Sequence, residues 1–94
     1  MSDLDFKILK KKVKMIRDQD PILSPSQKLG LVITMLRNES HLTQVELSNS
    51  TRLSRCSIAN IECGNANPSL AVLCSIAEGI GIPVSQIFLL MEAM

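Results

Sequence analysis

The chain has 94 residues, of which 46% are hydrophobic and only 2% aromatic, and its formal net charge at pH 7 is +1. This length suffices for one domain with one core and is too short for two. A net charge so close to zero excludes nucleic-acid binding by bulk charge alone. No apolar run is long enough to span a membrane, and lysines interrupt the N-terminal apolar residues, which argues against a signal peptide.

The three cysteines form no CxxC pair, and the single histidine cannot complete a zinc site with them. We therefore expect reduced thiols, no metal and no cofactor. The chain also has no Gly-rich phosphate loop and no arrangement of a nucleophile beside a base, so an enzyme is not expected. The reduced thiols predict a cytoplasmic protein.

The N-terminal segment is basic. Residues 6–17 carry six basic side chains and no acidic one. Apolar side chains recur within residues 4–18 at spacings of 3, 4 and 3, which predicts an amphipathic helix. Prolines follow and predict a linker, so residues 1–23 form an N-terminal basic amphipathic extension. Three interpretations stay open: the helix packs on its own domain or on a partner subunit, its lysines contact DNA phosphates, or it lies on anionic lipid.

Capping signals divide residues 24–94 into five short helices. Ser24 with Gln27, and Thr43 with Glu46, form capping boxes that satisfy the free N–H groups of a helix start. A serine cap, X-Pro pairs and glycines mark the other ends. The predicted helices span approximately residues 25–38, 44–50, 55–63, 67–79 and 83–91. In the fourth of these helices we expect four inward-facing residues, namely Leu70, Leu73, Ile76 and Ala77.

Several short motifs occur in a diagnostic order. They are Leu42-Thr43-Gln44, Leu53-Ser54-Arg55, Ile61-Glu62-Cys63-Gly64 and Asn67-Pro68-Ser69-Leu70. Their spacing resembles the lambda-repressor-like, Cro/XRE-type family of helix-turn-helix transcriptional regulators, over roughly two thirds of the chain from Leu29 to Phe88. The resemblance implies an all-α fold, a five-helix lambda-repressor-like DNA-binding domain with an additional N-terminal amphipathic helix. Residues 24–94 would be that domain, ending in a dimerisation helix.

The helix after Ser54 is the expected reading helix, because a helix in the major groove presents its N-terminal residues to base edges. Ile58 and Ile61 mark its buried side. The opposite, free side holds Arg55, Cys56, Ala59 and Asn60, which by the resemblance occupy the base-reading positions of the family. Arginine pairs with guanine and asparagine with adenine, each through two hydrogen bonds. The resemblance also implies phosphate contacts by Gln44, Ser54 and Ser57. To this phosphate-contacting set we add Asn65, at the end of the same helix, and Arg52, in the turn before it.

Two residues depart from the pattern of the family. Arg52 stands where the family often has glycine, and Ser48 where it often has alanine. A left-handed conformation at Arg52 would cost about 1 kcal/mol. We expect Glu62 to make a structural hydrogen bond or ion pair.

The chain ends in an apolar stretch that is typical of an interface. The expected dimerisation residues are Ile87, Phe88, Leu90 and Met91. The first hypothesis is therefore a repressor or activator that binds a double-stranded DNA operator as a homodimer, on the nucleoid. One alternative is an antitoxin-type protein that neutralises a partner toxin through residues 1–23 and autoregulates. Another is the controller protein of a restriction–modification system.

Overall fold

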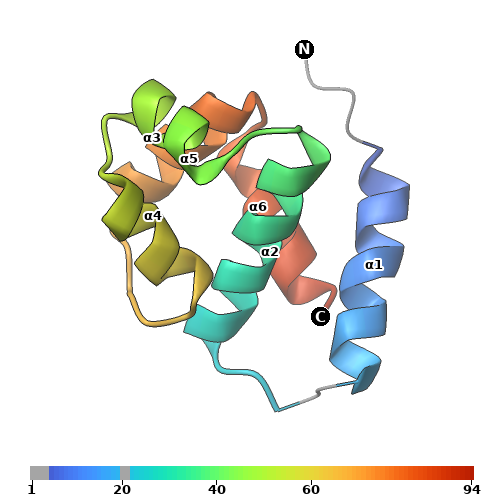
Figure 1. Cartoon of the computed structure of the whole chain (residues 1–94). Helices are drawn as coiled ribbons and strands as arrows, with labels where there is room; N and C mark the ends of the chain where they lie inside the picture. The colour runs from blue at the N-terminus through green and yellow to red at the C-terminus, as the bar shows by residue number, and fades with distance from the viewer. Residues whose placement is uncertain (1–4, 20–21) are drawn as a thin grey trace.

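The computed structural model describes residues 5–19 and 22–94, and within these ranges every regular element is an α-helix (Figure 1). The helices are α1 (Phe6–Gln19), α2 (Pro25–Glu39), α3 (Gln44–Thr51), α4 (Arg55–Glu62), α5 (Leu70–Ile80) and α6 (Val84–Glu92). The predicted all-α class is confirmed. No single described helix is long and apolar enough to cross a membrane, although α5 and α6 together, bent by 102°, reach the length and composition of a span.

Side-chain caps start five of the helices, and at α1 the Asp5 carboxylate accepts a hydrogen bond from the Lys7 N–H at 3.0 Å. The Ser24 hydroxyl accepts a hydrogen bond from the Gln27 N–H at 3.2 Å, and the Gln27 side chain accepts one from the Ser24 N–H at 2.9 Å. Thr43 and Glu46 form the same reciprocal pair at the start of α3. Ser54 caps α4. These three predicted starts are confirmed, because a cap depends only on residues within one turn.

The start of α5 differs from the prediction. The helix begins at Leu70 rather than at Asn67-Pro68, because the Ser69 hydroxyl accepts a hydrogen bond from the Val72 N–H at 3.2 Å and so acts as the cap. Leu70, expected to face inward, is 64% exposed. As the first residue of the helix, it projects into solvent before the inward-facing stripe begins. Leu73 and Ile76 are buried as predicted.

The core lies around α2, which packs against α4 on one side and α6 on the other, while α3 packs against α4 and α5. Gly30 permits the close approach of α2 and α4: a Cβ atom there would lie 2.5 Å from the Ile61 carbonyl oxygen. The N-terminal helix packs mainly on α6 and buries Leu9 and Val13 in the same core. Packing on its own domain, one of the three interpretations of this helix, is therefore observed.

Candidate nucleic-acid interface

A tight turn between α3 and α4 sets the direction of α4. Arg52 adopts the left-handed conformation with φ 63°, which explains why a glycine is favoured there. Its N–H donates to the Ser48 carbonyl at 3.1 Å. The Ser48 hydroxyl in turn donates to the Leu53 carbonyl at 2.7 Å. The two departures from the family pattern thus lie in one turn, where the serine hydroxyl satisfies a backbone carbonyl that an alanine would leave without this partner.

The two sides of α4 differ sharply in burial. Ile58 and Ile61 are 0% and 4% exposed and hold the helix to the domain. Three of the four predicted base-reading residues, Arg55, Cys56 and Asn60, are exposed, and Ala59 is half-buried. The structure therefore brings the four predicted residues together on the free side of one helix. Cys63, which the sequence reasoning did not select, is also exposed, and its spacing of seven from Cys56 places it on the same side.

The predicted phosphate-contacting residues surround this helix. Ser54 and Ser57 are exposed at its first turn, where the Ser54 hydroxyl accepts from the Ser57 N–H at 3.0 Å and donates to the Ser57 hydroxyl at 2.9 Å. Arg52 is exposed in the preceding turn, and Asn65 is exposed just beyond the helix. Such hydroxyls and helix N-termini are the groups that proteins commonly present to DNA phosphates.

Gln44 belongs to a buried polar network that joins three helices. Arg37 of α2 donates two hydrogen bonds to the Glu62 carboxylate of α4, from Nε to Oε2 at 2.7 Å and from Nη2 to Oε1 at 3.0 Å. Gln44 of α3 donates from Nε2 to Glu62 Oε1 at 3.0 Å. Arg37 Nη1 also donates to the Leu42 carbonyl at 2.7 Å. The ion pair expected of Glu62 is therefore present, and it fixes α4 against the two helices before it.

The network changes the acidity of both charged groups. Burial by itself raises the pKa of Glu62, but the hydrogen bonds from Arg37 and Gln44 outweigh it, and the pKa lies below its ordinary value. The hydrogen bond to Glu62 raises the pKa of Arg37. Both side chains are therefore charged at neutral pH. With side-chain exposures of 12% and 6%, little water competes for the pair.

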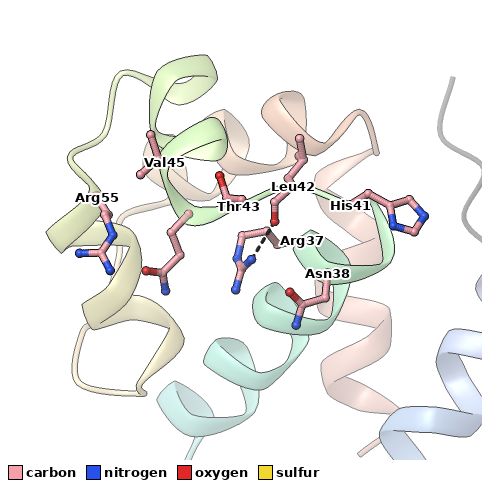
Figure 2. Close-up of a pocket in the computed structure, with 8 residues that line it drawn as sticks. Arg37, Asn38, His41, Leu42, Thr43, Val45 and Arg55 are labelled. Carbon is pink, nitrogen blue, oxygen red and sulfur yellow. Dashed lines mark hydrogen bonds between the residues drawn. The ribbon is translucent and has the colours of Figure 1, made fainter.

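A hollow of about 400 Å³ lies beside this network, between the end of α2 and the first turns of α3 and α4 (Figure 2). In Figure 2, Arg55 stands on one side and His41 on the other, with Thr43 and Arg37 between them. The Arg55 guanidinium and the N-terminus of α3 make this hollow favourable for an anion, whereas the charge of Arg37 is balanced by Glu62. Asn38 and His41 also line it but were not predicted, because their approach to α4 depends on the crossing of the helices.

The last helix corrects part of the predicted dimerisation surface. Ile87 and Leu90 are both 0% exposed, because they form the inward stripe of α6 and fill the core of their own domain. They are therefore unavailable to a partner. Phe88 is 37% exposed and Met91 is half-buried, while Leu89, which was not predicted, is 48% exposed. The free apolar surface of α6 is thus centred on Phe88 and Leu89.

Comparison with known proteins agrees with this geometry. The sequence model of the helix-turn-helix family matches residues 33–87, which include α3 and α4. The immunity repressor protein of Bacillus phage phi105 is 44% identical over 59 residues, which cover 63% of this chain and 41% of that protein. The competence pilus inhibition repressor of Acinetobacter baylyi is 38% identical over 66 residues, or 70% of this chain and 60% of that protein. The chain thus spans about half the length of these relatives.

A solved structure shows the same arrangement of helices. The restriction-modification controller protein C.AhdI from Aeromonas hydrophila superposes with a TM-score of 0.66 and 27% sequence identity, covering 67% of this chain and 96% of that one. The turn before α4, the helix α4 and the Arg37–Gln44–Glu62 network all lie within residues 33–87, which the family model matches. The chain therefore belongs to the helix-turn-helix family of lambda-repressor-like, DNA-binding transcriptional regulators.

Proposed function

We propose that the protein binds a double-stranded DNA operator as a homodimer and regulates transcription from it, on the nucleoid in the cytoplasm. The observation that carries this proposal is the free side of α4, where Arg55 and Asn60 are exposed on a short helix that begins with its N-terminus at the surface. The buried Glu62 network holds this helix in a fixed position, as a base-reading element requires.

Each group on this face has a chemical role in the proposal. Arg55 donates to guanine O6 and N7, and Asn60 pairs with adenine N6 and N7. Cys56 and Ala59 contact the methyl group of thymine. Phosphates are held by backbone N–H groups and side chains at the helix starts and turns, namely Gln44, Arg52, Ser54, Ser57 and Asn65. The hollow between α2, α3 and α4 would take one of these phosphates.

Selection of bound sequences from random DNA, followed by fluorescence anisotropy on the selected site, tests the proposal. Arg55→Ala and Asn60→Ala should each weaken binding by about 1–3 kcal/mol, roughly 5- to 150-fold, and relax sequence preference at one base pair. The matched controls Arg17→Ala on α1 and Asn49→Ala on α3 remove the same groups away from α4 and should bind normally. A protein that prefers no duplex over random competitor at low ionic strength would disprove the proposed function.

A second candidate is a controller of restriction–modification genes. It is favoured by the similarity to C.AhdI, because the chain covers 96% of the length of that controller protein. The two candidates share the DNA-binding surface and differ in the genes that they regulate. An operator found upstream of a neighbouring restriction endonuclease gene would support the controller, whereas one beside phage or competence genes would support a repressor of those genes.

A further inference from the structure

The charges of the chain are separated between its two ends. Residues 6–17, within α1, carry six basic side chains and no acidic one, whereas residues 56–94 contain three glutamates and no lysine, arginine or histidine. Arg37 neutralises one of these glutamates, Glu62, inside the domain. The other two, Glu78 of α5 and Glu92 of α6, are exposed. The molecule therefore presents a cationic helix and an anionic C-terminal surface.

The outer face of α1, defined by Lys7, Ile8, Lys11, Lys14 and Met15, combines positive charge with apolar surface. All five residues are exposed, and the spacing of seven between Ile8 and Met15 aligns these two side chains along the helix. Ile8 is 52% exposed and Met15 is 62% exposed. Leu9 and Val13 hold the opposite side of α1 to the domain, so its own packing leaves this outer face free.

This face lies away from the proposed DNA-reading surface. In Figure 1, α2 stands between α1 and α4, and α1 packs mainly on α6. Because the inner side of α1 contacts the domain, its outer face points away from a duplex bound by α4. The outer-face lysines Lys7, Lys11 and Lys14 therefore lie out of reach of an operator read by the same protomer, whereas Lys12 pairs with Glu39 of α2 in its own chain.

The surface of α6 alone is small for a dimer interface. Stable interfaces bury about 800 Å² and 20–30 residues on each partner. The helix α6 has nine residues, of which Ile87 and Leu90 are internal. The helix α1 lies directly beside it and has 14 residues. Of the seven large apolar side chains that are exposed in the described residues, four lie on these two helices, namely Ile8, Met15, Phe88 and Leu89.

We propose that α1 supplies half of the dimer interface, with its outer face docked on the α5–α6 surface of a second copy of this chain. Lysines of α1 then face Glu78 and Glu92 of the other protomer, and Ile8 and Met15 meet its Phe88 and Leu89. A two-fold axis repeats the contact, so each protomer provides one basic and one acidic surface. This inference rests on the homodimer of the proposed function and identifies which surfaces form it.

Charge reversal in the full chain tests this arrangement by sedimentation velocity without DNA. The double variant Lys11→Glu, Lys14→Glu should raise the dimer Kd at least about tenfold, because it places like charges opposite each other. Glu78→Lys with Glu92→Lys should do the same, and the quadruple variant should recover a large part of the affinity. Arg55→Glu is the control: it reverses one positive charge on α4, outside both proposed surfaces, and should leave the dimer Kd unchanged.

A second readout locates the contact. Carbodiimide cross-linking of a mixture of isotopically light and heavy protein should yield mixed-mass peptides that join α1 lysines to Glu78 or Glu92. Circular dichroism on every variant confirms folding, which these exposed sites should preserve.

Four outcomes would overturn the inference. If the α1 variant dimerises like the wild type while Phe88→Ser with Leu89→Ser abolishes the dimer, α6 alone forms the interface and the proposed function stands. If the charge-reversed surfaces weaken the dimer but do not rescue each other, they are not in contact. If the α1 variant keeps its dimer and instead loses binding to phosphatidylserine vesicles, this face is a lipid-binding surface. A wild-type protein that stays monomeric at every accessible concentration would refute both the inference and the homodimer of the proposed function. Operator binding, which is measured separately, would then show whether the protein still binds DNA.

Discussion

Replacing Glu62 with Gln removes the negative charge from the buried network while keeping the size of the side chain. The carboxylate accepts two hydrogen bonds from Arg37, at 2.7 and 3.0 Å, and one from Gln44 at 3.0 Å. An amide offers a single acceptor oxygen and turns N–H donors toward the other donors. Arg37, whose side chain is 12% exposed, would be left without its counter-charge.

The expected cost follows from this burial. Removing one partner of a buried ion pair costs about 3–5 kcal/mol. Because Arg37 keeps its hydrogen bond to the Leu42 carbonyl, we expect a loss of about 2–4 kcal/mol for Glu62→Gln. In a domain of this size that corresponds to a fall in Tm of roughly 10–25 °C. Operator binding should also weaken at temperatures where the fold survives, since the network positions α4.

Urea unfolding followed by circular dichroism measures this effect in a double-mutant cycle. The variants are Glu62→Gln, Arg37→Met and the two combined. The combined variant leaves no unpaired charge, so it should be less destabilised than the sum of the single variants, with a coupling of at least about 1.5 kcal/mol. A coupling below about 0.5 kcal/mol would refute the view that the pair acts as a unit.

The pH dependence gives an independent check. The folded pKa of Glu62 lies below its unfolded value because the hydrogen bonds from Arg37 and Gln44 outweigh the effect of burial. The stabilisation is therefore fully present above the unfolded pKa, which is about 4.3, and is lost as the pH falls through the lower folded value. The stability gap between wild type and Glu62→Gln should be full at pH 7 and shrink below about pH 4.

The remaining predictions concern backbone positions near α4. Arg52→Gly should stabilise the fold by about 0.5–1 kcal/mol in thermal denaturation, because glycine adopts φ 63° without steric cost; an unchanged or lower Tm would contradict this. The same variant should weaken operator binding if Arg52 contacts a phosphate. Gly30→Ala should cost about 1–3 kcal/mol, since its Cβ would lie 2.5 Å from the Ile61 oxygen and 2.6 Å from the Glu62 oxygen, and a Tm equal to that of the wild type would show that α2 and α4 separate easily. Ser48→Ala should cost about 1 kcal/mol in urea unfolding by removing the hydrogen bond to the Leu53 carbonyl, whereas the nearby Asn49→Ala should cost less.

The predictions that held are those that depend on neighbours within one helical turn. Ser24, Thr43 and Ser54 cap their helices as predicted, and the stripe of Leu9 and Val13 is buried. The pattern around Ser54 also placed Arg55 and Asn60 on the free side of α4, because Ile58 and Ile61 define the buried side by helical periodicity alone. Their contacts with bases stay a prediction.

The errors arose where several elements compete for the same space. Leu70 was assigned to the core by its periodicity, yet it lies exposed in the first turn of α5, before any neighbouring helix covers it. Ile87 and Leu90 were assigned to a partner because a C-terminal apolar run is typical of an interface. The structure buries both in their own domain, so the free surface shifts to Phe88 and Leu89.

The sequence by itself therefore determined the helices, most of their caps and the free side of α4, because hydrogen bonds and periodicity within a helix involve residues close together in the chain. The tertiary structure alone decided that Arg37, Gln44 and Glu62 meet, since 18 and 25 positions separate these partners along the chain. It also decided that α1 lies on α6. The amphipathic pattern of α1 specifies which of its sides is buried but not which surface covers that side.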